Sequence, residues 1–242
     1  MLVLLSVDAP DVNKMGMHLT YSHDGSTGEG YLALPESESG PAVIIIQEWW
    51  GLVGHITDVV DRFAAAGFVA FAPDLYHGQA AAEPDTAKKL MMELQLDQAG
   101  KEITSAANYL LSLPETSTKS VGVVGFCMGG SLAIWSGTLS PQVLATVGFY
   151  PGASWERHAP KWANYSGKSA LIHCAQGDGT SSAPGIQEAL REINASGGSA
   201  KAFDYVGTNH AFFNDDRPEV FDPLAAALAW ERTLDFFFTT LK

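Results

Sequence analysis

Cys127 lies in a stretch of small residues that could expose its thiol as a nucleophile. In GFCMGG, residues 125–130, glycines stand two positions before and two positions after the cysteine. A nucleophile between a strand and a helix adopts a strained backbone, and large neighbours would collide there. The helix start favours a thiolate, and the backbone N–H of Met128 is placed to bind an oxyanion. The alternative is that Cys127 is a small buried residue in a glycine-rich loop.

An aspartate and a histidine follow Cys127, each directly after a later strand-like run. Asp178 follows SALIHCA and His210 follows KAFDYV. Ligands of parallel sheets bind beyond the carboxyl ends of the strands, so we expect the three side chains to meet. Nucleophile, acid and histidine in this order form the triad of the α/β-hydrolase fold, which makes Cys127 the nucleophile, His210 the base and Asp178 the acid that orients it. The alternative for Asp178 is that it caps a helix beginning near Ser182.

Other reactive residues receive lesser roles. His173 and Cys174 lie inside a strand-like run and are predicted to be packed in the core. His77 follows another strand and is predicted to form a polar part of a pocket wall. Asp215 and Asp216 follow the histidine of the triad too closely to orient its ring, so we expect them in a loop or at the rim. The sequence shows no metal-ligand spacing, phosphate-binding loop or dinucleotide fingerprint, and we expect neither a metal nor an organic cofactor.

The elements that must position these residues alternate between two periodicities. Continuous apolar runs predict strands buried on both faces, namely AVIII (42–46), FVAFAP (68–73), SVGVVGF (120–126), LATVGFY, SALIHCA and KAFDYV. Helical spacing predicts helices over 55–67, 85–113, 129–139, 183–197 and 222–242, with Gly100 breaking or kinking the second. MHLTYS and GEGYLALP predict two shorter antiparallel strands at an edge. We therefore predict one α/β domain over residues 1–242, an α/β-hydrolase fold with a mostly parallel central sheet and helices on both faces.

Composition and charge exclude several classes of protein. The chain has 242 residues, of which 46% are hydrophobic and 17% charged, as in a compact globular protein. Its formal charge of −13 argues against nucleic acid or an anionic membrane surface as a partner. The opening MLVLLSVDAP lacks the positive charge and cleavage site of a secretory signal, so it is predicted to be a ragged start or an edge strand. We expect a cytoplasmic monomer or small homo-oligomer, in which a disulfide between the two cysteines is not expected.

Four stretches together resemble the dienelactone hydrolase family, a cysteine-dependent branch of the α/β-hydrolases. They are IIIQEWWG, FVAFAPDLYHG, GVVGFCMGG and GTNHAFFNDDRPE, and the resemblance runs from about Gly30 to the carboxyl terminus. It implies the same triad roles for Cys127, Asp178 and His210. It also implies that Glu48 lies close to the thiol and activates it when substrate binds.

The resemblance supplies a second oxyanion donor, the backbone N–H of Trp49. It also gives Glu48 a physical purpose, because a carboxylate beside the thiol disfavours a thiolate in the free enzyme. The thiol would then stay neutral, and less prone to oxidation, until the ester arrives.

The sequence departs from the family where the substrate's carboxylate would bind. The best-known members hydrolyse an unsaturated lactone that carries a carboxylate, and they hold it with arginines near the first crossover and shortly after the histidine. Here PDLYHGQAA has no arginine, and Arg217 is the nearest one after the histidine, flanked by acids. We therefore expect a neutral ester or lactone as the small-molecule substrate. The candidate residues of an aromatic pocket are Trp49, Trp50, Tyr76 and Phe212.

The expected reaction is hydrolysis of a carboxylic ester or lactone in two steps. Cys127 attacks the carbonyl, His210 moves the protons, and water hydrolyses the resulting thioester. Two alternatives stay open. One is a thioesterase or acyl transferase that uses the same triad, and the other is a non-catalytic, ligand-binding member of the fold.

Overall fold

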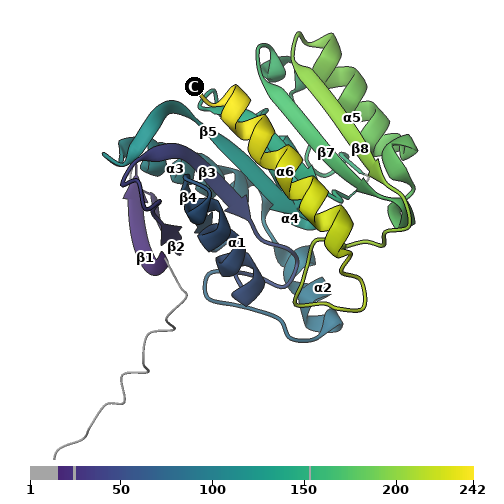
Figure 1. Ribbon diagram of the computed structural model, residues 1–242, viewed down its shortest axis with the longest axis horizontal. Coiled ribbons are helices and arrows are strands. Elements are labelled where there is room, and N and C mark those ends of the chain that lie inside the picture. The colour runs from purple at the N-terminus through teal and green to yellow at the C-terminus, as the bar shows by residue number, and fades with distance from the viewer. Residues whose placement is uncertain (1–15, 24–25, 153) are drawn as a thin grey trace, which may run out of the picture.

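The computed structural model describes residues 16–23, 26–152 and 154–242, so the prediction for the first ten residues lies outside the described part. Within these residues the chain forms an eight-stranded sheet in the order β1-β2-β4-β3-β5-β6-β7-β8 (Figure 1). The β1–β2 and β2–β4 pairs are antiparallel, and the remaining neighbours are parallel. The strands are β1 (Gly16–His23), β2 (Ser26–Ala33), β3 (Gly40–Ile46), β4 (Val69–Pro73), β5 (Thr116–Phe126), β6 (Val143–Phe149), β7 (Ser169–Ala175) and β8 (Ser199–Tyr205).

Helices cover both faces of this sheet, which explains why the central strands are apolar on both sides. Figure 1 shows α1 and α6 crossing the face nearer the viewer, and both pack in one hydrophobic cluster. Side chains of α3, α4 and α5 pack in a second cluster on the opposite face. The prediction of a mostly parallel sheet between two helical layers is therefore confirmed. The helices are α1 (Gly54–Ala65), α2 (Pro84–Glu93), α3 (Leu96–Ser112), α4 (Met128–Ser136), α5 (Pro184–Ala195) and α6 (Pro223–Thr240).

The long helical pattern over 85–113 folds as two helices, and the break is not at Gly100. The chain leaves helical geometry at Leu94 and Gln95, whose ψ angles are 119° and 105°. Gly100 lies inside α3, where an added Cβ would stand 2.9 Å from the ring of Trp135 on α4. The glycine therefore allows α3 to pack closely on α4, which corrects the prediction that it interrupts the helix.

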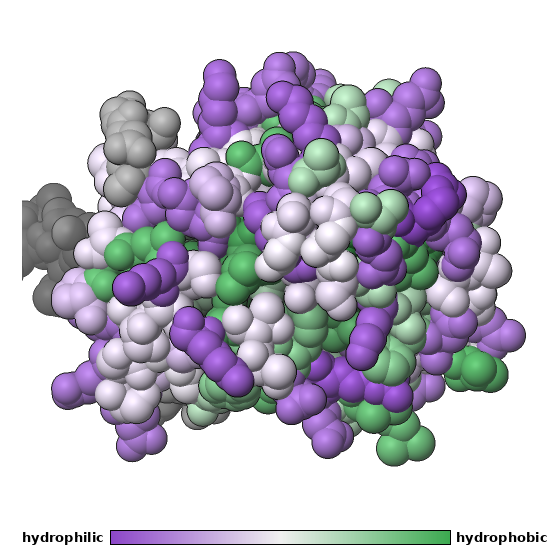
Figure 2. All heavy atoms as spheres, turned by 90° about the horizontal axis from the view of Figure 1, so that it is seen from above, coloured by the Kyte–Doolittle hydropathy of each residue, from purple (hydrophilic) through white to green (hydrophobic). Residues whose placement is uncertain are grey.

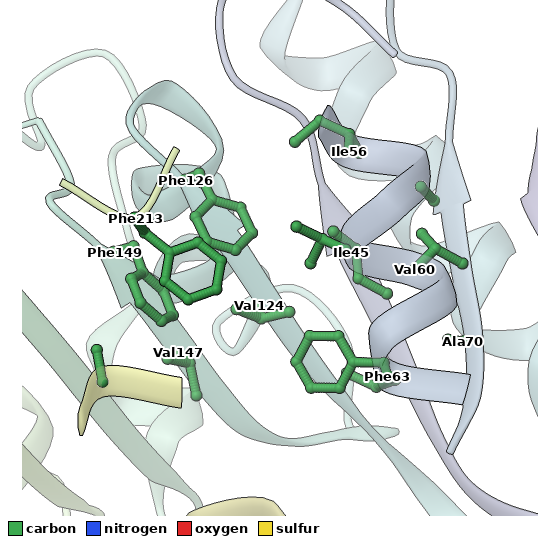
Figure 3. Close-up of a cluster of buried hydrophobic side chains, with 14 of the residues drawn as sticks. Ile45, Ile56, Val60, Phe63, Ala70, Val124, Phe126, Val147, Phe149 and Phe213 are labelled. Atoms are coloured by element: carbon green, nitrogen blue, oxygen red, sulfur yellow. The ribbon is translucent and has the colours of Figure 1, made fainter. Parts of the chain in front are cut away.

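An aromatic cluster lies beneath the turn that carries Cys127. Figure 3 shows Phe126 at the end of β5, Phe149 at the end of β6 and Phe213 grouped together. The Phe213 ring centroid lies 5.3 Å from that of Phe126 and 4.9 Å from that of Phe149. All three rings are at most 2% exposed, and burial of each stabilises the fold by about 1.5–3 kcal/mol. The cluster ties the segment after His210 to the ends of two central strands.

The face of the molecule drawn in Figure 2 carries both polar and hydrophobic side chains. Figure 2 shows hydrophilic side chains spread over the face seen from above, with hydrophobic residues interspersed among them. Among the described residues, no helix combines the length and the apolar character needed to cross a bilayer.

Candidate active site

Cys127 occupies a strained turn between β5 and α4. Its backbone angles are φ 56° and ψ −118°, a conformation that L-residues rarely adopt. A Cβ on Gly125 would stand 2.0 Å from the carbonyl oxygen of Gly129, and one on Gly129 would stand 2.3 Å from that of Gln47. Both positions that flank the cysteine therefore require glycine, because a backbone carbonyl oxygen lies too close to each of them for a side chain. They let the chain reverse so that Cys127 begins the helix.

His210 and Asp178 form a hydrogen-bonded pair beside the cysteine. The Nδ1 atom of His210 lies 2.8 Å from Oδ2 of Asp178, and His210 shares a pocket wall with Cys127. Burial disfavours charge on the ring, but the interactions with Asp178 and Cys127 outweigh burial and raise the pKa of His210 to about 10. The structure thus brings together the three residues of the predicted triad.

Asp178 does not cap the following helix. It ends a 3₁₀ turn over Gln176–Asp178, whereas α5 begins at Pro184 with Ala183 as its N-cap residue and no side-chain cap. The carboxylate is therefore used by His210, and the capping alternative is not observed.

The two predicted oxyanion donors have free N–H groups. Met128 is the first residue of α4, so its N–H has no partner within the helix. In the described part of the chain, neither the Met128 N–H nor the Trp49 N–H donates a hydrogen bond. Both remain available to a developing negative charge.

Glu48 is a buried carboxylate held by two neutral donors. Its side chain accepts a hydrogen bond from the Tyr150 hydroxyl at 3.4 Å and another from the Asn214 amide at 2.8 Å. Glu48 is only 2% exposed, and it makes no ion pair with any residue that the structure describes. Burial, then the negative charge of Glu48 and that of Cys127, raise the pKa of Tyr150, so the tyrosine lies near both groups. Tyr150 and Asn214 received no role from the sequence, although Tyr150 directly follows β6 and Asn214 lies four residues after His210.

A pocket of about 270 Å³ opens beside Cys127 and His210. Its walls are largely apolar, and Arg157 is the one lysine or arginine among the described residues that line it. Leu94 and Leu96 reach the pocket from the break between α2 and α3. The full lining is Met91, Leu94, Leu96, Cys127, Met128, Ser131, Leu132, Gly152, Ser154, Arg157, His158 and His210.

Two residues predicted to line this pocket lie elsewhere. Phe212 is fully buried, and its ring packs 5.5 Å from Tyr150 and 4.9 Å from Tyr205 between centroids. The side chain of His77 is 62% exposed, and its Nε2 lies 3.5 Å from a Glu102 carboxylate oxygen, over a separate pocket. Their expected roles are thus corrected.

The other three aromatic candidates surround Met128. Tyr76 is 4% exposed, and its hydroxyl lies 3.5 Å from the Met128 sulfur. Burial, then the charge of Cys127, raise the pKa of Tyr76. Trp49 and Trp50 pack against each other and against the same small cluster. These rings support a pocket residue and are not among the residues that line the pocket.

The loop between β6 and β7 supplies several wall residues of the pocket. Trp155 is 3% exposed and donates a hydrogen bond to the Gly185 carbonyl at 2.7 Å, which fixes the loop to α5. His158 lies between the rings of Trp135 and Trp155, at 5.7 Å from each centroid. Burial and the charge of Arg157 lower the pKa of His158. The length and aromatic composition of this loop are the sequence features that indicate a pocket wall.

The remaining cysteine and the core histidine have structural positions, as predicted. Cys174 is 3% exposed, and burial together with Asp204 and Asp178 raises its pKa to about 12. His173 is fully buried and hydrogen-bonded at both ring nitrogens. Both cysteines of the chain are free thiols.

Known proteins resemble this chain over nearly its whole length. The "Protein usf" of Aquifex pyrophilus is 34% identical over 92% of this chain and 98% of its own. "Carboxymethylenebutenolidase 1" of Cupriavidus pinatubonensis is 28% identical over 91% of this chain and 94% of its own. A crystal structure of a protein assigned as a dienelactone hydrolase, from Klebsiella pneumoniae, superposes with a TM-score of 0.78 at 25% identity, covering 92% of this chain and 98% of that one.

A family pattern gives the same result. The pattern of the "Dienelactone hydrolase family" matches residues 29–241, which includes every strand and helix described above except β1 and the first residues of β2. The protein therefore belongs to the dienelactone hydrolase family, a group of hydrolases with the α/β-hydrolase fold.

Proposed function

We propose that this protein hydrolyses carboxylic esters or lactones through a cysteine nucleophile and a thioester intermediate. One observation carries the proposal. Cys127 stands on a strained turn beside a histidine whose Nδ1 is 2.8 Å from a carboxylate. The N–H of Met128, at the same turn, and the N–H of Trp49, in the segment after β3, donate no hydrogen bond within the described part of the chain. Family membership supports the hydrolysis of esters or lactones, and this arrangement supports the identity of the nucleophile.

The acylation step follows from the positions of the acceptors and donors. Asp178 occupies Nδ1 of His210, so Nε2 accepts the thiol proton while Sγ of Cys127 attacks the carbonyl carbon. The carbonyl oxygen becomes an oxyanion that accepts hydrogen bonds from the N–H groups of Trp49 and Met128. When the intermediate collapses, the C–O bond breaks and His210 gives its proton to the leaving oxygen.

Deacylation repeats these transfers with water as the nucleophile. His210 removes a proton from water, and the hydroxide adds to the thioester carbonyl. Collapse breaks the C–S bond, releases the acid and returns the proton to the thiolate. The raised pKa of His210 shows that Asp178 and Cys127 favour the charged ring, which in this mechanism forms when the thiol proton is transferred and then protonates the leaving oxygen.

Glu48 gives the thiol a controlled reactivity. Its buried carboxylate lies near the same tyrosine hydroxyl as Cys127, and no cation pairs with it in the described residues. A nearby negative charge disfavours a second one, so Glu48 disfavours the thiolate until substrate binds.

A neutral substrate remains our expectation. The pocket walls are largely apolar, with Arg157 as the one lysine or arginine among the described residues that line them. Comparing kcat/KM for a neutral ester and for a carboxylated lactone tests this expectation, and strong preference for the anion contradicts it. A thioesterase or acyl transferase would use the same triad, and it is distinguished by testing thioesters and acyl acceptors beside the esters.

Replacement of the nucleophile tests the mechanism directly. Cys127→Ala should lower turnover of an activated ester by at least about 10³-fold, since removal of a nucleophile disables the whole catalytic unit. Rapid acid quench and intact-mass analysis should show an acyl adduct on the wild-type protein and none on this variant. His77→Ala is the matched control, because His77 lies outside the pocket, and it should retain normal turnover. Substantial turnover by Cys127→Ala would contradict Cys127 as the nucleophile, whereas an absence of turnover in the wild-type protein would favour the non-catalytic alternative.

A further inference from the structure

The pocket of about 270 Å³ beside Cys127, which we call the thiol pocket, has an apolar part and a basic part. Among the described residues that line it, the titratable side chains other than Cys127 and His210 are Arg157 and His158. Both come from the loop between β6 and β7. The large apolar side chains come from α2, from the break after it, from the start of α3 and from α4, namely Met91, Leu94, Leu96, Met128 and Leu132.

Arg157 brings a positive charge to the thiol pocket without a partner in the described part of the chain. Its guanidinium makes neither a hydrogen bond nor an ion pair with any described residue. In contrast, Arg62, Arg191 and Arg217 each pair with a carboxylate. A guanidinium carries N–H donors and no acceptor, so a ligand group that pairs with Arg157 must be an acceptor oxygen.

His158 lies next to this guanidinium as a neutral ring. Its centroid is 5.7 Å from those of Trp135 and Trp155, so two indoles hold the imidazole in place. Burial, then the charge of Arg157, lower the pKa of His158. The ring therefore adds no second positive charge to this part of the wall, and a single guanidinium faces the ligand.

The carboxylates around the thiol argue against an anionic ligand group. Glu48 is buried near the same tyrosine hydroxyl as Cys127 and makes no ion pair with a described residue. Asp178 adds a further negative charge, 2.8 Å from Nδ1 of His210. A substrate carboxylate would be repelled by both, whereas a carbonyl oxygen accepts a hydrogen bond without bringing a charge.

The basic part of the pocket lies along α4, the helix that Cys127 begins. His158 packs against Trp135, which is eight positions after Cys127, so this loop reaches about two helical turns beyond the thiol. The alcohol oxygen must stay beside His210, which gives it a proton. The acyl chain stays bonded to Sγ of Cys127 and can extend along α4, so it is the part that reaches Arg157.

We propose that the preferred substrate is an ester or lactone whose acyl part carries a second, uncharged carbonyl oxygen, which accepts a hydrogen bond from the guanidinium of Arg157. This inference rests on the proposed function and names its substrate class. No bond forms or breaks at the second carbonyl group. Arg157 thus determines specificity, and the hydrocarbon between the two carbonyl groups contacts the apolar part of the pocket.

Matched pairs of methyl esters isolate the contribution of this oxygen. kcat/KM is measured by proton release for methyl 5-oxohexanoate, 6-oxoheptanoate and 7-oxooctanoate, each beside the unsubstituted ester of the same chain length. A ketone so far from the attacked carbonyl leaves its chemical reactivity nearly unchanged, so the ratio within a pair reports binding. In the wild-type protein the oxo ester should be the better substrate in at least one pair.

Replacement of the arginine should remove this preference. Arg157→Met keeps the length of the side chain but not its donors, and it should lower the oxo-to-parent ratio of kcat/KM about ten-fold, the effect of one hydrogen bond with a charged donor. Arg191→Met is the matched control, because Arg191 pairs with Glu192 on α5 and does not line the thiol pocket. It should keep the wild-type ratio. Arg157→Leu replaces Arg157→Met if circular dichroism shows that the latter has not folded.

Other outcomes overturn the inference. A wild-type preference for the unsubstituted ester in every pair would do so, as would equal ratios in the wild type and Arg157→Met. Higher kcat/KM for monomethyl adipate than for methyl 5-oxohexanoate would show that the pocket selects a carboxylate. An Arg157-dependent preference for acetates of keto alcohols, absent from the oxo esters, would place the oxygen on the leaving group. Failure of the proposed function is a separate result, because it appears as hydrolysis of methyl hexanoate that persists in Cys127→Ala.

Discussion

The proton affinity of His210 depends on three local influences that act in opposite directions. Burial disfavours the charged ring, whereas the hydrogen bond with Asp178 and the neighbouring Cys127 favour it. The pKa of about 10 shows that the two acidic neighbours outweigh burial. Asp178 therefore does more than orient the ring, because it also favours the charged ring that the proposed mechanism forms when His210 accepts the thiol proton.

Removal of this carboxylate charge should lower the pKa of His210. In Asp178→Asn the ring loses a partner that favours its charged form, so its titration should move from about 10 towards the ordinary value of about 6.5. Imidazole ¹H–¹⁵N NMR spectra recorded from pH 5 to 11 measure the shift. Asp216→Asn removes an equal charge from the following loop without a hydrogen bond to the ring, and its titration should match the wild type. An unchanged titration in Asp178→Asn would contradict this account.

The sequence predicted the triad because each of its members follows directly after a strand. Tyr150 and Asn214 escaped prediction because their importance depends on Glu48, which is 102 and 166 residues away from them in the chain. No local pattern records a contact of that range. The error at Phe212 has a local cause that sequence does not show, since Ala211 has a φ of 66° and Phe212 lies in the core beyond this bend.

The segment between His210 and α6 holds several site residues in place at once. Asn214 donates its hydrogen bond to Glu48, and the neighbouring Asp215 is bound by two residues of α1. His55 Nδ1 lies 3.2 Å from one carboxylate oxygen of Asp215, and Arg62 donates to the other at 2.5 Å. Phe213 anchors the same segment in the aromatic cluster seen in Figure 3. Asp215 thus fixes the backbone that aims Asn214 at Glu48.

Loss of this attachment should reduce catalysis more than stability. Asp215→Ala deletes a partly exposed carboxylate together with its contacts to His55 and Arg62. This deletion should lower the unfolding free energy by less than about 1 kcal/mol. The looser loop should misplace Glu48 and lower kcat/KM about ten-fold, comparable to one hydrogen bond with a charged group. Ester kinetics and urea unfolding of the same preparations measure the two effects.

The control for this prediction uses the other acidic partner of the same arginine. Asp58 pairs with Arg62 and, among the described residues, makes no hydrogen bond or ion pair with the loop. Asp58→Ala should therefore leave kcat/KM unchanged, and Asp215→Asn should recover part of the lost activity by keeping a hydrogen-bond acceptor. Equal kinetic losses in Asp58→Ala and Asp215→Ala would exclude a positioning role for Asp215.

Strands were more predictable than the boundaries between helices. A strand buried on both faces must be apolar throughout, so runs such as 42–46 are visible in the sequence. The break between α2 and α3 has no such signal, because two residues leave helical geometry while the apolar spacing continues. Glycine often marks the end of a helix, but Gly100 instead allows α3 to pack closely against α4. The wall residues Leu94 and Leu96 were missed for this reason.

The whole sheet accounts for the convergence of residues from distant parts of the chain. Glu48, Cys127, Tyr150, Asp178 and His210 follow β3, β5, β6, β7 and β8 in turn. Parallel strands end at the same edge, so these five residues meet although the first and the last are 162 positions apart in the chain. Rigid helical layers on both faces then hold that edge in place.

The buried His173 connects strands β7 and β8 with helix α6. His173 on β7 lies between Tyr205 on β8 and Thr233 on α6, at 2.7 Å and 2.9 Å. The Thr233 hydroxyl donates to the Ala229 carbonyl, so it accepts from Nε2–H of His173. Arg232 donates to the Tyr205 oxygen, which leaves the Tyr205 proton for Nδ1. This network requires the neutral ring, and burial together with Arg232 lowers the pKa of His173 to about 3.

The neutral histidine should make the fold sensitive to acid. The unfolded chain binds a proton at His173 below its ordinary pKa of about 6.5, whereas the folded protein resists it down to about 3. Between these values the unfolded state holds more protons, so this contribution to stability is complete above about pH 6.5 and is lost as the pH falls towards 3. His173→Gln should be less stable at pH 7, and its unfolding free energy should fall less steeply between pH 6 and 4, by about 1 kcal/mol per pH unit. Urea unfolding across this range measures the slopes, with His77→Gln as an exposed control that should follow the wild type. Parallel curves for the wild type and His173→Gln would show that this histidine does not govern acid stability.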